Sequence, residues 1–81
     1  IVMKYLATFH THFDAVKYLK SIKGIAREAV MKPVPRKLSS SCGSCVVFEL
    51  QGELVAEVLT ADFERLYGIE GDEYRLLAEN E

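Results

Sequence analysis

The sequence predicts an α+β fold of the ferredoxin-like class, a β-α-β-β-α-β two-layer sandwich with an antiparallel sheet. Three observations predict it. The 81 residues suffice for one domain, so we expect residues 1–81 to form a single domain. Apolar residues make up 49% of the chain and charged residues 27%, a globular composition. Segments with strand and helix patterns follow one another in the order that this fold requires.

The first strand and the first helix are the most clearly marked elements. Residues 2–9 are apolar and rich in residues that favour extended structure, which predicts a strand. Thr11 then stands in a helix N-cap position, with Asp14 three residues later. Gly24 is expected just past the helix end. We expect the buried face of this amphipathic helix to carry apolar residues spaced by three, namely Phe13, Val16, Leu19 and Ile22.

Two further strands and a long loop follow. Residues 28–34 read as a strand, and Pro33 places it at a sheet edge because proline donates no ladder hydrogen bond. Residues 45–50 read as the next strand, after a loop over residues 35–43 that is long enough to suggest function. In the predicted topology this third strand lies antiparallel beside the first, so the end of one meets the start of the other.

The region after residue 51 allows two predictions. The one that we favour is a long helix ending before Gly68. The alternative is a hairpin around Gln51 and Gly52, with a helix that begins only at Thr60. In both, residues 74–78 form the last strand. The long helix rests on six apolar residues that share one broad helical face: Leu54, Val55, Val58, Leu59, Phe63 and Leu66.

The charges are divided unevenly along the chain. The net charge of −2 gives no reason to expect a nucleic-acid partner. Residues 1–40 hold eight Lys and Arg against two acids, and residues 41–81 hold two against ten. Such asymmetry can mark a surface for an anion or a partner, although we favour a fold that interleaves the two halves. No run approaches the roughly 18 apolar residues of a membrane span, so we expect no membrane partner.

The predicted topology brings the chemically active residues together at one end of the sheet. A helix N-terminus carries partial positive charge, and basic side chains in the long loop add to it. A cysteine in such surroundings should have a lowered pKa and more of the nucleophilic thiolate. Glycine beside it lets backbone amides approach an anion. The candidate site consists of His10, His12, Arg36, Lys37, Ser41, Cys42, Gly43 and Cys45.

Three chemistries are open for the two cysteines. A CxxC redox pair would need a turn, because extended residues 42–45 would hold the two Cα atoms roughly 10 Å apart, beyond disulfide range. A Cys₂His₂ metal site has suitable donors but no zinc-finger spacing, and we expect neither a metal nor a cofactor. The third is a single nucleophilic thiolate on Cys42, with Cys45 as a helper, a resolving thiol or a small buried hydrophobe.

At these residues the sequence resembles the DUF3343 family of sulfur and selenium carrier-like proteins. The resemblance covers about residues 3–50. The Pro-x-Pro-Arg … Cys-Gly spacing is its most specific part, whereas Cys45 lies outside the pattern. The matching segments are Tyr5-Leu6-Ala7-Thr8-Phe9, His12-Phe13-Asp14-Ala15, Gly24-Ile25, Pro33-Val34-Pro35-Arg36 and Ser41-Cys42-Gly43.

The resemblance implies a carrier that holds a persulfide or selenosulfide on Cys42 between a sulfur- or selenium-donor enzyme and an acceptor protein. Arg36 would belong to the surroundings of that cysteine. The resemblance also implies a cytoplasmic protein. Two cysteines in a chain that shows no secretory signal agree with a reducing compartment.

Two other functions remain open on the residues alone. One is a CxxC dithiol redox or metal-binding module. The other is an interaction domain without chemistry, which would form a homodimer through an open sheet face. We expect that face to carry Met3, Tyr5, Ala7 and Phe9. No pair of catalytic carboxylates, nucleotide-binding loop or Ser/His/Asp set is visible, so a carrier is favoured over an independent enzyme.

Overall fold

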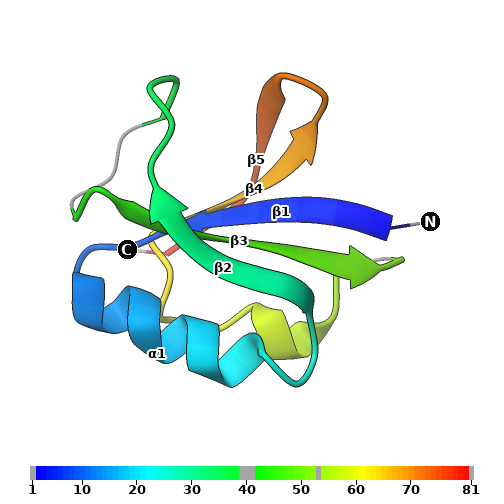
Figure 1. The fold of residues 1–81 in the computed structure, drawn as a ribbon, viewed down its shortest axis with the longest axis horizontal. Coiled ribbons are helices and arrows are strands. Elements are labelled where there is room, and N and C mark those ends of the chain that lie inside the picture. Colours follow the sequence, from blue (N-terminus) through cyan, green and yellow to red (C-terminus); the bar gives the residue numbers. More distant parts are fainter. Residues whose placement is uncertain (1, 39–41, 53, 81) are drawn as a thin grey trace.

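The computed structural model describes residues 2–38, 42–52 and 54–80, and within these it forms one five-stranded antiparallel sheet with a single α-helix (Figure 1). The fold is therefore α+β with an antiparallel sheet, as predicted, whereas the ferredoxin-like β-α-β-β-α-β order is not confirmed. A one-turn 3₁₀ helix, η1, stands where the second α-helix was expected. The elements are β1 (Val2–Thr8), α1 (His12–Ile22), β2 (Arg27–Pro33), β3 (Ser44–Gln51), η1 (Ala56–Val58), β4 (Arg65–Glu70) and β5 (Glu73–Glu79).

β1 lies at the centre of the sheet, whose strand order is β2-β3-β1-β4-β5. It pairs antiparallel with β3, so that Thr8 at its end lies opposite Cys45 at the start of β3. The other side of β1 pairs with β4, where Thr8 lies opposite Arg65. β2 is an edge strand and ends at Pro33, which confirms the position that proline predicted.

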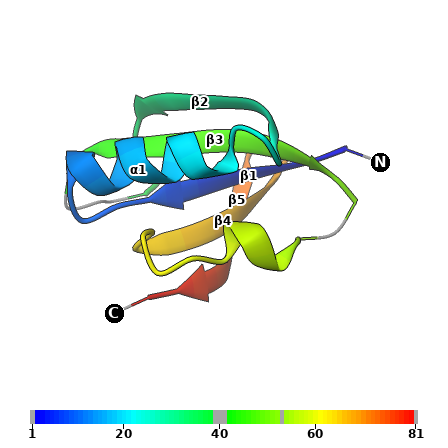
Figure 2. The same cartoon turned by 90° about the horizontal axis from the view of Figure 1, so that it is seen from below.

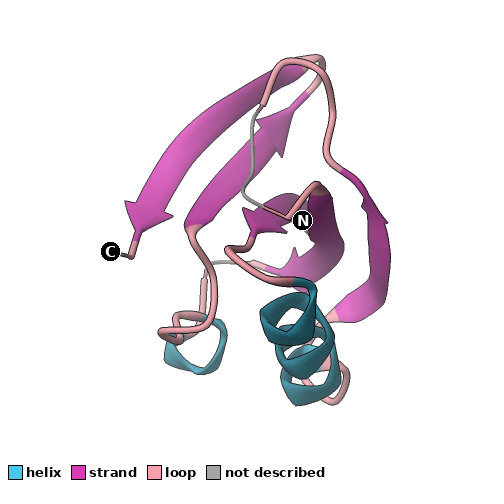
Figure 3. Cartoon of the chain, turned by 90° about the vertical axis from the view of Figure 1, so that its left-hand side faces the viewer, coloured by secondary structure: helices cyan, strands magenta, loops and turns pink. Residues whose placement is uncertain are grey.

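One face of the sheet is covered by α1 and by the irregular chain that contains η1. Figure 3 shows the two helical segments beside each other beneath the sheet, and Figure 2, seen from below, shows α1 along β3. The main core lies between these layers. Among the described residues, no helix has the length and apolar character needed to cross a membrane.

The first turn of α1 follows the sequence prediction, whereas its buried face does so only in part: Ile22 is buried and Leu19 packs against the core, but Phe13 does not. The Thr11 hydroxyl accepts the Asp14 N–H at 3.1 Å, which confirms the N-cap. The fully buried stripe is Ala15, Tyr18 and Ile22. Phe13 is 75% exposed because it lies about 160° around the helix from Ala15, at 3.6 residues per turn. A spacing of three drifts around a helix and does not define one face by itself.

Both predictions for residues 52–66 are wrong. Neither a long helix, nor a returning hairpin strand, nor a helix capped by Thr60 is present among the described residues of this region. The apolar residues predicted to share one helical face are divided between two parts of the structure. Val58 and Phe63 pack into the main core from an irregular segment, whereas Leu66 belongs to β4. β4 forms because the central strand β1 needs a partner on its second edge, and Gly68 therefore lies within a strand.

The sheet face expected to be open is instead the covered one. Tyr5, Ala7 and Phe9 are buried in the main core beneath the helical layer, and of the expected set only Met3 stays partly exposed. The surface predicted for a homodimer is therefore not available. Strand alternation places Leu6 and Thr8 on the opposite face of β1. Where a longer second helix was expected, the structure has a groove at the far end of the covered face. Its lining residues include Met3, Leu54 and Leu77.

Tyr18 connects the helix to both the sheet and the irregular segment. Its ring lies 5.3 to 6.0 Å, centroid to centroid, from the rings of Phe9, Phe48 and Phe63. Its hydroxyl donates a buried hydrogen bond of 2.7 Å to the Val58 carbonyl. Burial and, to a smaller degree, the charge of Asp62 raise the pKa of this phenol. The phenol therefore remains a donor throughout the physiological range.

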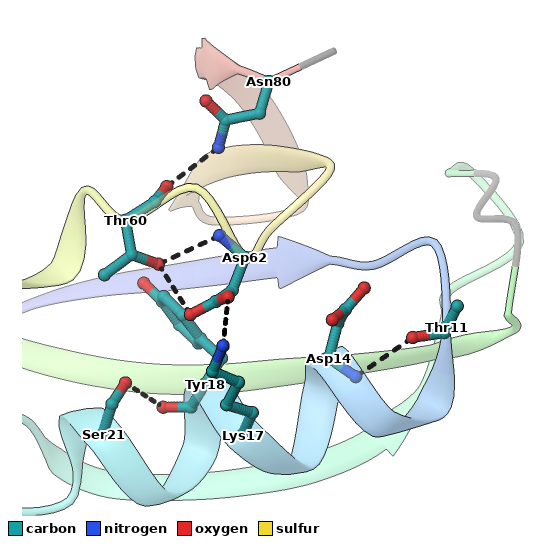
Figure 4. A network of polar contacts seen from close by, with 8 residues as sticks. All are labelled: Thr11, Asp14, Lys17, Tyr18, Ser21, Thr60, Asp62 and Asn80. Carbon is teal, nitrogen blue, oxygen red and sulfur yellow. Dashed lines mark hydrogen bonds and ion pairs between the residues drawn. The ribbon is translucent and has the colours of Figure 1, made fainter.

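A polar network holds the segment after η1 in place around Tyr18 (Figure 4). The Asp62 N–H donates to the Thr60 hydroxyl at 3.2 Å, which closes a local turn. The Asp62 carboxylate pairs with Lys17 of α1 at 3.5 Å. From the chain after β5, the Asn80 amide donates to the carbonyls of Thr60 and Phe63. Side chains from α1, from residues 60–62 and from the chain after β5 thus hold this irregular segment in place, where a regular helix would use its own backbone hydrogen bonds.

Replacing Tyr18 by Phe should lower the free energy of unfolding by about 1 to 3 kcal/mol, because the buried Val58 carbonyl loses its donor. Urea denaturation followed by circular dichroism measures the change. Tyr74→Phe is the matched control, since Tyr74 lies in a partly exposed position and its hydroxyl removal should cost little. Equal losses for the two variants would contradict the role assigned to the Tyr18 hydrogen bond.

Candidate functional site

The end of β1, the start of α1 and the start of β3 lie at the same end of the molecule (Figures 1 and 2). The pairing of Thr8 with Cys45 fixes this arrangement. The CxxC segment begins two residues before β3 and runs into it. β1 and β3 are therefore antiparallel neighbours, as the predicted site required.

Cys42 is a partly exposed thiol beside the main core and is not part of a disulfide. Its Sγ lies 3.5 Å from the Ser44 carbonyl oxygen, to which the thiol donates. Gly43 follows with φ of +76°, a conformation that side chains other than glycine adopt only with strain. The Gly43 carbonyl accepts the Val34 N–H at 3.0 Å, which joins the two ends of the loop. The turn at glycine thus holds Cys42 at the surface just before the strand begins.

Cys45 is a free, fully buried thiol on the opposite face of the sheet. It belongs to a second cluster with Leu6 and Tyr67. Its Sγ donates to the Pro33 carbonyl at 3.7 Å. Burial raises the pKa of this thiol to about 11, although the nearby ammonium of Lys32 acts in the opposite direction. At neutral pH the cysteine is therefore protonated and a poor nucleophile.

The two cysteines differ in surroundings as well as in exposure. Cys42 packs against the core beneath the helical layer, whereas Cys45 packs on the other face. They are not joined by a disulfide. Among the described residues, no group of three or more His, Cys, Asp or Glu side chains is placed to hold a metal ion. The dithiol and metal alternatives therefore have no preformed site in the described part of the chain.

The basic residues of the predicted site are dispersed. Arg36 is exposed in the turn after β2. Lys37 extends to the tip of the β4–β5 hairpin, where its ammonium donates to the Asp72 carbonyl at 2.7 Å. His12 is exposed at the first position of α1. Ser41 lies outside the described residues. Lys37 therefore has a hydrogen-bond partner on the side of the sheet away from α1.

His10 has a carboxylate neighbour that the sequence did not reveal. The His10 Nδ1 lies 3.5 Å from the Glu64 carboxylate, and Glu64 is mostly buried. The Glu64 N–H donates to the Thr8 carbonyl at 2.6 Å, so the chain just before β4 is held against the end of β1. Glu64 was placed on the polar face of a predicted helix. Only the pairing of β4 with β1 could have indicated its position beside His10.

Fold and site together define a small α+β domain that presents one accessible cysteine on a glycine turn and buries a second. A family model described as "Putative Se/S carrier protein-like" matches residues 4–67, and the chain belongs to this family. The matched range includes both cysteines and β1 to the middle of β4. Comparisons with curated proteins and with solved structures gave no match.

The raised pKa of Cys45 predicts a loss of stability in mild alkali. In the unfolded chain a cysteine ionises near pH 8.5, whereas folded Cys45 holds its proton up to about pH 11. The folded state therefore binds more protons above pH 8.5, and its free energy of unfolding should fall by about 1 to 2 kcal/mol between pH 8 and pH 10. Urea midpoints at these pH values measure the fall, to which the buried phenol of Tyr18, whose pKa is also raised, adds near pH 10.

The variant Cys45→Val is the control for this pH dependence, because valine keeps an apolar side chain in the cluster and removes the ionisable group. Its stability should change less between pH 8 and pH 10 than that of the unmodified protein. An equal fall in both proteins would assign the pH dependence to other groups.

The turn at Gly43 can be tested by adding a single methyl group. Gly43→Ala should destabilise the fold by about 1 to 2 kcal/mol, because alanine is strained in the left-handed backbone conformation of this position. A clash does not contribute, since no other atom lies within 4 Å of the added methyl group. Gly24→Ala is the matched control, because Gly24 also has open space and its φ is not positive. Thermal unfolding compares the two. A larger loss at Gly24 would refute the assignment.

Proposed function

We propose that Cys42 carries sulfur or selenium, as a persulfide or selenosulfide, between a donor enzyme and an acceptor protein. The observation that carries the proposal is the difference between the two thiols: Cys42 reaches solvent and Cys45 does not. A group carried between two proteins has to be accessible at both transfers. Membership of the Se/S carrier-like family supports the same cargo.

The loading step is a thiol exchange. The Cys42 thiolate attacks the outer sulfur of a donor persulfide, R–S–SH. The new Cys42 S–S bond forms as the S–S bond of the donor breaks, so that the donor leaves as the thiolate R–S⁻ and Cys42 becomes Cys42–S–SH. An acceptor nucleophile then takes the outer sulfur and returns Cys42 to the thiolate. Selenium follows the same balance, with Cys42–S–SeH as the loaded form.

Other residues of the predicted site supply charge and proton transfer in this proposal. The Gly43 amide, the Arg36 guanidinium and the N-terminus of α1 stabilise the sulfur anion. His10, oriented by Glu64 at 3.5 Å, takes the thiol proton, with the exposed His12 as the alternative. Lys37 takes part only if it leaves Asp72.

Incubation with a polysulfide, followed by intact mass spectrometry under non-reducing conditions, tests the cargo site. The expected result is a gain of one sulfur, removed by dithiothreitol and absent in Cys42→Ser. Cys45→Val should load as the unmodified protein does. Loading that survives Cys42→Ser and disappears in Cys45→Val would overturn the assignment to Cys42.

A further inference from the structure

The face of the sheet away from α1 carries a small enclosed cluster around Cys45. The buried residues Leu6, Cys45 and Tyr67 form its centre. Val34 and Leu38 pack against it from the chain that leaves β2. We call residues 34–38 the flap. Figure 1 shows the flap rising from the end of β2 on the side of the sheet opposite α1.

One lysine attaches the flap to the far side of this face. Lys37 donates to the Asp72 carbonyl, at 2.7 Å, in the turn between β4 and β5. The flap itself is a short turn closed by the Leu38 N–H on the Pro35 carbonyl. The Lys37 bond is exposed, and such bonds contribute little net stability. The flap is therefore held over the cluster by two apolar side chains, by the exposed Lys37 contact and by the Val34 N–H bond to the Gly43 carbonyl, few enough contacts for a partner to displace it.

Thr8 places an unused polar group beside the buried thiol. Its side chain is fully buried, and its Oγ1 has no hydrogen-bond partner. Thr8 lies directly opposite Cys45 in the β1–β3 ladder, so the two side chains share a face with Cβ atoms about 5 Å apart. A buried hydroxyl without a partner costs free energy. A sulfur anion on Cys45 would give that hydroxyl an acceptor, and Lys32, directly opposite Cys45 on β2, would add a positive charge.

We propose that Cys45 is a resolving thiol for cargo on Cys42 and that the flap controls when it reacts. The inference rests on the proposed function. With the flap closed, Cys45 is protonated and shielded, and Cys42 can carry its cargo. When a partner displaces the flap, the Val34 hydrogen bond to the Gly43 carbonyl breaks and releases the turn that holds Cys42 on the other face, so that Cys42 can reach Cys45. Water then reaches Cys45, which loses its proton to solvent, and the Thr8 hydroxyl and Lys32 stabilise the thiolate.

The resolving step balances without an added oxidant. The Cys45 thiolate attacks the Cys42 sulfur of Cys42–S–SH. The Cys42–Cys45 disulfide forms, the bond to the outer sulfur breaks, and that sulfur leaves with the electron pair as HS⁻. The outer sulfur is reduced and the Cys45 sulfur is oxidised, while the Cys42 sulfur keeps its oxidation state. The protein would then release its cargo as free sulfide, or as selenide from a selenosulfide, in addition to passing it directly to a nucleophile.

The first test uses Ellman's reagent and does not depend on persulfide loading. Cys42 should react first and release one thionitrobenzoate. Cys45 should then displace the second from the Cys42 mixed disulfide, leaving a chain two hydrogens lighter by intact mass. Cys45→Val should release one equivalent and keep the adduct. Circular dichroism establishes that this variant is folded.

The flap is tested by the rate of the second release. Lys37→Met should accelerate it by roughly three- to tenfold, the factor expected when one charge-assisted hydrogen bond at the surface is lost. Lys20→Met, on the exposed face of α1, should leave it unchanged. Equal rates in both variants, or a second adduct on Cys45 in place of the disulfide, would overturn the gated resolving thiol.

A second arm follows the persulfide itself. Protein loaded with one sulfur should release sulfide and form the disulfide, faster in Lys37→Met, whereas loaded Cys45→Val should retain its sulfur. Cys42 that loads and keeps its sulfur in all variants would refute the resolving role and leave the carrier function standing. Failure of Cys42 to load would refute the carrier function, and the Ellman experiment would still decide whether Cys45 resolves a disulfide on Cys42.

Discussion

The hydrogen bond from the Tyr18 hydroxyl to the Val58 carbonyl is the contact on which the arrangement of the layers depends. A sheet of five strands is too wide for the single helix α1, so a second covering element has to be held in place without regular structure. Tyr18 does this from the helix side, through three aromatic neighbours and one buried donor. Because the segment so fixed leads directly into β4, the same contact sets where Glu64 meets His10.

The two faces of β3 explain why two cysteines three residues apart have different properties. Strand alternation turns Cys45 away from α1, and the flap then removes it from water. Cys42 precedes the strand, and the left-handed turn at Gly43 leaves it at the boundary between core and solvent. The two thiols differ in their exposure to solvent. Lys37 does not account for the difference, because its ammonium is hydrogen-bonded to Asp72 on the other face.

The parts of the fold that the sequence predicted are those with local signals. The Thr11 cap and the edge position of Pro33 depend on single residues and their neighbours, and both are confirmed. The second helix failed because a broad apolar face was read as helical, whereas Leu66 was needed as a partner for β1, about sixty residues earlier in the chain. At the site, the adjacency of β1 and β3 followed from topology. The partners of Lys37 and His10 depend on the β4–β5 hairpin, which no local pattern revealed.

The central position of β1 also determines how this chain can reach its fold. The first strand is flanked by β3 and β4, whose residues come some forty to sixty positions later. Contacts of such sequence separation are slow to form, since each closes a long loop before any burial compensates for it. During synthesis, β1 and α1 therefore leave the ribosome with both strand edges unpaired, and the sheet closes only when β4 is available. Until then the apolar strand is open to pairing with other chains, so folding of this protein should be sensitive to its concentration and to the chaperones that bind extended segments.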